Sequence, residues 1–350
     1  MSKPLIVIAD TDEKYLATLE YKFLSELDDM VELEIISRKD YFEQFFQSPR
    51  TIEILAVCED LYSGDLQRHN VNHMFVLTEN NESGNTEELA VTRIFKYTGI
   101  KEIYNELIYR SKAGIGLEQN ENKETKVIAV YSAIGGSGKT ALSIGLADSL
   151  QQNHRKVFYI NTESIQEFSV YLKEKNTLTN DGIRSIKNDL THTYTNIKNY
   201  IREEGFSYVP PLNMTLEAYN LDYSLYFNLI QTAKESREFD FIIVDVEMGC
   251  SEDKMKILQM ADKAIMVCLQ DSISINKAEY LLRNIDVRDR EKYLFVCNKY
   301  DESKENAYLQ SQLQKQCTMS EYVEYSESTN MGIAQLAALH GIQRLAYMFI

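Results

Sequence analysis

Short apolar runs alternate along this chain with longer stretches in which apolar residues recur every three or four positions. Runs of the first kind predict strands, and stretches of the second kind predict helices. In the first part of the chain, strands are predicted at 5–9, 31–36, 52–57, 74–77 and 93–95. Helical spacing is clear over 101–110. Because strands and helices alternate, we expect a parallel sheet with helices on both faces.

The second part of the chain repeats this pattern. It begins with an apolar strand at 127–131, followed by a helix from Lys139 to about Leu150. Further strands are predicted at 156–160, 241–244, 264–269 and 293–297. A Tyr-rich stretch, roughly 164–238, separates the second and third of these strands. Its periodicity is mostly helical, and Pro210-Pro211 interrupts it.

A polar segment lies between the two parts and has the composition of a linker, GIGLEQNENKET at 114–125. We therefore predict an α/β protein with two domains, 1–113 and 126–350. The length of 350 residues agrees with two domains of ordinary size.

Charge and composition narrow the class of partner. The net charge is −16 and no basic stretch occurs, so we expect protein partners and no nucleic acid, which needs clustered Lys and Arg. No run of about 18 apolar residues is present, so no transmembrane segment is expected. The first residues lack a signal-peptide layout, which predicts a cytoplasmic protein. The five scattered cysteines show no metal-ligand spacing and are expected to be reduced.

The strongest chemical signal is the segment AIGGSGKT at 133–140, which fits the P-loop pattern with Ala in place of its first Gly. Small residues allow backbone N–H groups to surround phosphate oxygens, and the following helix adds its positive N-terminus. We expect Lys139 to contact the β- and γ-phosphates of a nucleoside triphosphate. The hydroxyl of Thr140 is expected to bind Mg²⁺.

A second signal is the apolar strand that ends in Asp245. An acid at this place, next to a P-loop, commonly holds Mg²⁺ through water. Gly249 follows four residues later and would let the backbone approach the γ-phosphate. The predicted metal-binding residues are therefore Thr140 and Asp245.

With these motifs placed, residues of roughly 126–310 resemble the MinD/ParA superfamily of ATPases. The matching motifs are the glycine loop, the acid and glycine at Asp245 and Gly249, Ala261-Asp262, and Asn298-Lys299 where the family has Asn-Arg. The resemblance implies ATP and Mg²⁺ as cofactors and a homodimer. It also implies a nucleotide-binding set that comprises Gly135, Gly136, Ser137, Gly138, Lys139, Thr140, Ala141, Gly249, Asn298 and Lys299.

The chain departs from this superfamily at two points. Ile134 occupies the position of the signature lysine, which reaches the partner's phosphates in the family's dimer. Asn161 and Glu163 stand where the family has D-x-D, so only Glu163 is left to orient the attacking water. We therefore expect at most a weak ATPase, with Lys139, Glu163 and Asp245 as its catalytic residues.

The first part of the chain resembles a response-regulator receiver, which has a flavodoxin-like fold. Asp10 and Asp12 match its acidic pair, Thr78 its hydroxyl and Lys96 its lysine. Cys58 occupies the place of the phosphoacceptor, and neither Glu59 nor Asp60 is in register. An atypical receiver used as a docking surface is the prediction.

A receiver-like domain before a MinD-like ATPase is similar to the layout of the TadZ/CpaE family, and GFSYVPP at 205–211 resembles a passage of that family. The resemblance implies a role in positioning a Tad-type (type IVb) pilus or secretion apparatus at the membrane or the cell pole. The partners would be proteins of that apparatus, bound through the receiver-like domain.

Four alternatives stay open. Asn298-Lys299-Tyr300-Asp301 spells the N-K-x-D motif with which GTPases recognise guanine. Ile134 and Asn161 favour a non-hydrolysing scaffold that binds ATP. A MinD-like division-site ATPase is a third hypothesis. Finally, the apolar segment 332–350 is predicted to close the core, and its alternative is a helix in peripheral contact with a membrane.

Overall fold

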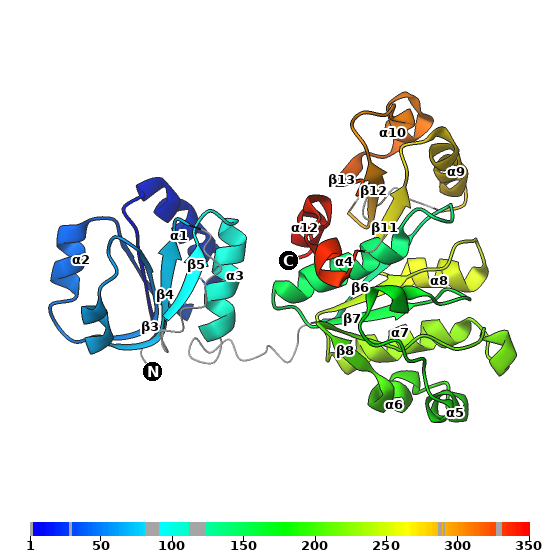
Figure 1. Cartoon of the computed structure of the whole chain (residues 1–350), viewed down its shortest axis with the longest axis horizontal. Helices are drawn as coiled ribbons and strands as arrows, with labels where there is room; N and C mark the ends of the chain where they lie inside the picture. The colour runs from blue at the N-terminus through cyan, green and yellow to red at the C-terminus, as the bar shows by residue number, and fades with distance from the viewer. Residues whose placement is uncertain are drawn as a thin grey trace. The chain divides into compact units, whose positions relative to one another are not determined.

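The chain forms two compact units, Met1–Asn122 and Lys123–Ile350 (Figure 1). The computed structural model describes residues 3–27, 30–80, 91–111, 124–285, 289, 291–326 and 331–350. Most of the linker predicted at 114–125 lies outside the described residues.

The N-terminal unit contains a parallel five-stranded sheet in the order β2-β1-β3-β4-β5. Its strands are β1 (Leu5–Ala9), β2 (Glu32–Ile36), β3 (Thr51–Cys58), β4 (Asn70–Thr78) and β5 (Val91–Phe95). The helices α1 (Glu13–Leu27) and α3 (Ile100–Ser111) cover one face, and α2 (Lys39–Phe45) covers the other (Figure 1). This strand order is that of flavodoxin-like doubly wound sheets.

The helix that strict β-α alternation predicts between β3 and β4 is not formed. A short 3-10 turn, Gly64–Arg68, occupies this connection. The connection from β4 to β5 runs through 81–90, outside the described residues.

The C-terminal unit is built on an eight-stranded sheet in the order β13-β12-β11-β6-β10-β7-β9-β8. The neighbours pair in parallel except β8 and β9. The strands are β6 (Lys126–Tyr131), β7 (Val157–Asn161), β8 (Arg202–Glu204), β9 (Phe206–Tyr208), β10 (Phe241–Asp245), β11 (Lys263–Cys268), β12 (Tyr293–Tyr300) and β13 (Met319–Glu324).

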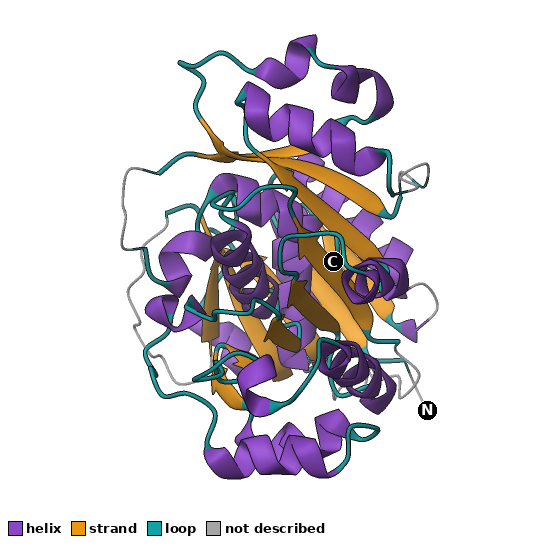
Figure 2. Ribbon diagram, turned by 90° about the vertical axis from the view of Figure 1, so that its right-hand side faces the viewer, coloured by secondary structure: helices purple, strands orange, loops and turns teal. Residues whose placement is uncertain are grey.

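Helices cover both faces of this sheet, so that the strands lie between two helical layers (Figure 2). One layer is α4 (Lys139–Gln152), α11 (Ile333–Ala337) and α12 (His340–Tyr347). The other layer and its surroundings comprise α5 (Asn180–Asn188), α6 (Thr193–Ile197), α7 (Ser224–Ser236), α8 (Glu252–Met260), α9 (Ser272–Leu282) and α10 (Gln312–Gln316).

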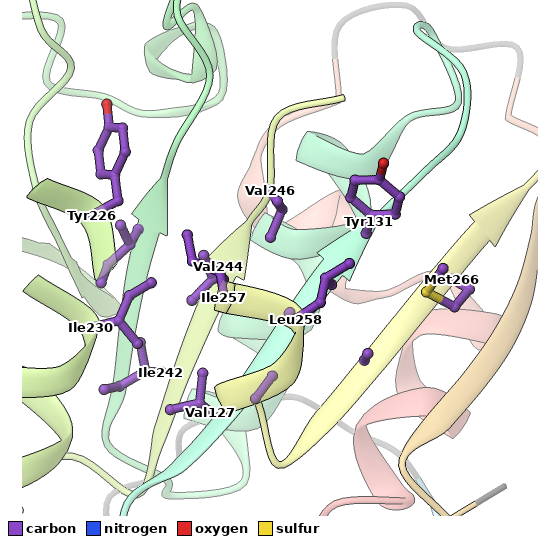
Figure 3. Close-up of a cluster of buried hydrophobic side chains, with 14 of the residues drawn as sticks. Val127, Tyr131, Tyr226, Ile230, Ile242, Val244, Val246, Ile257, Leu258 and Met266 are labelled. Carbon is purple, nitrogen blue, oxygen red and sulfur yellow. The ribbon is translucent and has the colours of Figure 1, made fainter. Parts of the chain in front are cut away.

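The strands β6 and β10 at the centre of this sheet are buried throughout, apart from the exposed Lys126 at the start of β6. Side chains of β6 and β10, among them Val127, Tyr131, Ile242 and Val244, pack against α7 and α8 (Figure 3). A strand buried on both faces reads as a continuous apolar run, which is why these strands were predictable. Their rigid packing gives the loops at their carboxyl ends a fixed base.

The Tyr-rich stretch differs from its mostly helical prediction. It contains the hairpin of β8 and β9, which adds two strands beside β7. Gly205 turns this hairpin with φ of 84°, a conformation that side chains disfavour, and a Cβ there would lie 2.9 Å from the Asp148 carboxylate. Strand β13 was also absent from the prediction.

The prediction that 332–350 closes the core is confirmed for α12, whose Ile342, Leu345 and Ala346 are buried. Both α11 and α12 pack on α4, where Gly145 permits the close approach: a Cβ there would lie 2.7 Å from Ile342. Within the part of the chain that is described, no helix has the length and apolar character needed to cross a membrane.

Candidate nucleotide-binding site

The predicted phosphate-site residues meet at one edge of the C-terminal sheet. Strands β6, β10 and β7 are neighbours and run parallel, so their carboxyl ends lie side by side. The glycine loop follows β6, the loop with Glu163 follows β7, and the loop with Gly249 follows β10. In open α/β sheets, ligands bind at this edge.

The glycine loop is held in a conformation that requires glycine. Gly138 has φ of 82°, and a Cβ on it would lie 2.5 Å from the Asn298 amide nitrogen. Helix α4 begins at the next residue, Lys139, so the N-terminus of a long buried helix faces the loop. The Ser137 side chain is buried, and its hydroxyl has no hydrogen-bond partner among the described residues.

Lys139 is paired with Glu163. The lysine Nζ lies 3.2 Å from Glu163 Oε1, and its side chain is 5% exposed. The backbone N–H of Glu163 donates to Asn161 Oδ1 at 3.0 Å. The structure therefore brings together two of the predicted catalytic residues. Phosphates of a nucleotide that pair with Lys139 would break this ion pair, and the Glu163 carboxylate would then be available to bind a water molecule.

Asp245 lies at the end of β10 and is fully buried. Its Oδ2 accepts hydrogen bonds from Thr140 Oγ1 at 2.6 Å and from Asn161 Nδ2 at 2.8 Å. The Tyr159 hydroxyl donates to the same oxygen at 3.2 Å. Burial raises the pKa of Asp245 to about 6, although the Thr140 hydrogen bond and the charge of Lys139 favour the ionised form.

Thr140 and Asp245 fit a magnesium ion. Both offer oxygen, the donor that Mg²⁺ prefers, and they are adjacent. Asp245 Oδ1 is buried and has no hydrogen-bond partner in the described chain, which leaves a lone carboxylate oxygen for a water-mediated metal contact. The bound ion would neutralise phosphate charge, and these two residues would hold it.

Two residues in contact with Asp245 add to the predicted set. The sequence motifs give Tyr159 no role, and they include Asn161 only as the replacement of an acid. Both donate to Asp245, and Asn161 Nδ2 also lies 3.1 Å from the Tyr159 hydroxyl. Tyr159 and Asn161 lie two apart on β7 and so share one face of the sheet, but their contact with Asp245 depends on the pairing of β7 with β10.

Asn298 and Lys299 hold the glycine loop from the end of β12. Asn298 Nδ2 donates to the Ser137 carbonyl at 2.8 Å, and Lys299 Nζ donates to the Gly136 carbonyl at 2.9 Å. Asp301 has other contacts: its carboxylate accepts from Ser303 and lies 2.9 Å from Lys304 Nζ. The Ser303 and Lys304 hydrogen bonds lower the pKa of Asp301 to about 2.

The remaining predicted positions lie around the loop. Ile134 is half-buried, and its N–H donates to Ser132 Oγ at 3.3 Å. Ala141 is half-buried in the first turn of α4. Gly249 has φ of 110°, and its carbonyl accepts from the Tyr131 hydroxyl at 3.0 Å. The hydrogen bond from Tyr131 to Gly249 holds the loop that follows β10 against the end of β6.

The N-terminal unit assembles a separate polar cluster at the carboxyl ends of its strands. Lys96 Nζ lies 3.1 Å from Asp10 Oδ2, and both side chains are buried. Asp12 Oδ1 accepts from two N–H groups in the first turn of α1. Cys58 ends β3 and is 5% exposed, and burial raises the pKa of its thiol. Thr78 Oγ1 donates to the Ile94 carbonyl at 3.3 Å.

Comparison with known proteins points to one class for the C-terminal unit. Residues 125–294 match a family described as an AAA domain. The chain is 25% identical over 167 residues to the septum site-determining protein MinD of Buchnera aphidicola. This match covers 47% of this chain and 61% of that protein. The chain is 23% identical over 158 residues to MinD of Bacillus subtilis, covering 45% and 58%. The chain thus spans about three-fifths of the length of these curated relatives.

Among solved structures, a ParA family ATPase from Chlorobium tepidum superposes with a TM-score of 0.51 at 16% identity. The match covers 64% of this chain and 99% of that one, and it shows a shared fold. Together, the P-loop, the parallel sheet and these relatives support a MinD/ParA superfamily ATPase domain. These similarities agree with the resemblance drawn from the motifs.

Proposed function

We propose that the C-terminal unit binds ATP with Mg²⁺ and hydrolyses it slowly. The observation that carries this proposal is the 2.6 Å hydrogen bond from Thr140 to Asp245 beside the buried Lys139. A P-loop hydroxyl, a strand-end acid and a P-loop lysine are the groups with which such enzymes hold a metal-bound triphosphate.

Slow turnover follows from the charges around the reacting phosphate. Lys139 stabilises the charge on the phosphates, and Glu163, once released from Lys139, orients the water that attacks the γ-phosphorus as ADP leaves. Ile134 supplies no cation where the superfamily has a second lysine. Loss of one preorganised charge contact commonly reduces turnover by about a hundredfold or more.

Titration with labelled nucleotide and measurement of phosphate release test this proposal together. We expect Mg²⁺-dependent binding of ATP and phosphate release that is slow and depends on Glu163. Binding without release by the unaltered chain would instead support the non-hydrolysing scaffold. Failure to bind any nucleoside triphosphate would contradict the proposal altogether.

Recognition of guanine is the second candidate, because Asn298 and Lys299 hold the P-loop carbonyls from the first two positions of N-K-x-D. The Asp301 carboxylate, which would bind guanine, is instead engaged by Ser303 and Lys304. We therefore favour ATP. Binding of labelled ATP measured in competition with GTP shows which nucleotide the site prefers. Loss of GTP binding alone in an Asp301→Asn variant would support guanine recognition.

For the cell, we propose that the chain positions a Tad-type pilus or secretion apparatus, with the N-terminal unit as its docking surface. The flavodoxin-like strand order and the polar cluster around Asp10 and Lys96 support a receiver-like unit. The competing role is that of a MinD-like division-site ATPase.

Imaging of the labelled full chain in its own cells separates these roles. Foci that coincide with the pilus apparatus, and loss of pili when the gene is deleted, are expected. Foci at the division site, with misplaced septa on deletion, would support the division-site role instead.

A further inference from the structure

Glu247, in the loop after β10, makes contacts that the hydrolysis chemistry described above does not use. Its Oε1 accepts a hydrogen bond from the backbone N–H of Ser164 at 3.0 Å and a second from the Ser164 hydroxyl. Its Oε2 lies 2.6 Å from Lys254 Nζ, and the two side chains are 24% and 12% exposed. One carboxylate thus joins the loop after β7 to the first turn of α8.

The same two loops are joined a second time through Thr162. The backbone N–H of Thr162 donates to the Asp245 carbonyl at 3.0 Å, and the N–H of Glu247 donates to Thr162 Oγ1 at 3.0 Å. Glu163 lies between Thr162 and Ser164. The residue expected to orient the water is therefore flanked by two tethers to the loop that follows Asp245.

Lys254 completes the arrangement from α8. Its Nζ donates to the Met248 carbonyl at 2.9 Å as well as pairing with Glu247. It also lies 5.3 Å from the centre of the Tyr223 ring, and the Tyr223 hydroxyl is 2.6 Å from Thr162 Oγ1. The lysine balances the Glu247 charge and orients the carboxylate towards Ser164.

We propose that Glu247 is a positioning residue that ties the loop carrying Glu163 to the loop carrying Asp245, and so places Glu163 for its action on the attacking water. The inference rests on the proposed ATPase function. Through Glu247, Glu163 on the loop after β7 keeps its position relative to Asp245 at the end of the neighbouring strand β10.

The first test is structural and needs no turnover. Replacement Glu247→Ala removes the acceptor of the Ser164 N–H, so amide hydrogen exchange of that residue should become faster in the full chain. Replacement Glu247→Gln keeps one oxygen acceptor and should preserve most of the protection. Glu252→Gln is the matched control, since Glu252 also pairs with a lysine on α8, at 3.0 Å, but is 85% exposed. Unchanged Ser164 exchange in Glu247→Ala overturns the proposal.

The second test is kinetic. Glu247→Ala should lower kcat by about tenfold to a hundredfold, because a small misplacement of a catalytic group costs this much. The KM for ATP should change less than about threefold, since the phosphate contacts of Lys139 persist. Glu247→Gln should recover part of kcat, and Glu252→Gln should behave as the unaltered chain.

A double variant distinguishes positioning from a general loss of structure. If Glu247 acts through Glu163, adding Glu247→Ala to a Glu163→Gln variant should change kcat little further. A full additional loss in the double variant overturns the positioning role. Absence of ATP binding by the unaltered chain is a different outcome, because it contradicts the ATPase function itself. ATP binding without any turnover would overturn the kinetic role assigned to Glu247 and Glu163 alike.

Discussion

The two oxygens of the Asp245 carboxylate have different surroundings, and this difference shapes the chemistry of the phosphate site. One oxygen accepts hydrogen bonds from Thr140, Asn161 and Tyr159, and the other has none among the described residues. An acid in place of Asn161 would bring a second carboxylate next to the first and favour protonation of one of them. Asn161 instead donates, so the pKa of Asp245 is lower than it would be beside an acid at position 161, although burial still raises it to about 6.

The charge of Lys139 should dominate nucleotide affinity. Replacement Lys139→Ala removes a charge-assisted contact with the phosphates, each worth about 1.5–3 kcal/mol. We expect ATP affinity to fall by at least about tenfold in calorimetric titrations. Lys256→Ala is the control, because Lys256 is a half-exposed lysine on α8 that pairs only with Glu252 and Asp253 among the contacts described. Equal affinity in Lys139→Ala and the unaltered chain would refute the P-loop assignment.

The buried Asp245 should also make stability depend on pH in the absence of metal. Its pKa is raised from 3.8 to about 6, so the folded state favours the protonated acid. The resulting stabilisation is complete below about pH 4 and is lost as the pH rises through about 6. A rise of this size corresponds to about 3 kcal/mol in the free energy of unfolding.

Asp245→Asn removes this titration while keeping an oxygen acceptor for Thr140 and Asn161. Urea denaturation in a chelating buffer should show the variant gaining stability relative to the unaltered chain as the pH rises from about 4 through about 6, and a constant difference at higher pH. A difference that is already constant from about pH 4 to about pH 6 would mean that Asp245 is not buried as an acid in the folded chain.

At the scale of elements, strands that are buried on both faces can be predicted from the sequence. Strands that form mainly because they pair with a neighbour cannot. Strands β6 and β10 appear as continuous apolar runs because both faces are covered. Strands β8 and β9 have three residues each, too few for a periodic signal. Strand β13 alternates buried and half-buried residues, so its pattern was present but weaker.

The residues of the site likewise fall into those that the sequence predicts and those that depend on strand pairing. The glycine loop and Asp245 were predictable because each forms a local motif at a strand end. The contact of Asp245 with Asn161 depends on their register as direct neighbours on β10 and β7, strands far apart in the sequence. A single sequence contains no information on that register, so the roles of Tyr159, Asn161 and Glu247 required the structure.

The polar cluster of the N-terminal unit should not accept phosphate. Cys58 ends β3, where the resemblance to receivers would place the phosphoacceptor, and a thiol does not form the acyl phosphate of receivers. Intact mass after incubation with acetyl phosphate and Mg²⁺ should show no addition. The variant Cys58→Asp provides the comparison, since phosphorylation of the variant alone would support the alignment. Phosphate mapped to Glu59 or Asp60 in the unaltered chain would show that the alignment is wrong.

At the scale of the whole molecule, charge opposes self-association. Two copies of a chain with net charge −16 repel each other, and salt screens this repulsion. Two bound triphosphates brought face to face would add further negative charge. A nucleotide-dependent dimer of that kind therefore needs a cation at the interface, and Ile134, which the resemblance aligns with the superfamily's signature lysine, provides none.

We accordingly predict that any homodimer forms largely independently of ATP. A buried anion without a paired cation is costly, so triphosphates in the contact would weaken it rather than stabilise it. Sedimentation at physiological salt, with and without ATP and Mg²⁺, should give the same association state. A monomer that becomes a tight dimer only with ATP would refute the prediction. The variant Ile134→Lys supplies the missing charge and should make association depend on ATP and raise turnover. If it changes neither, Ile134 does not occupy the signature position, and the charge that controls association must come from elsewhere in the chain.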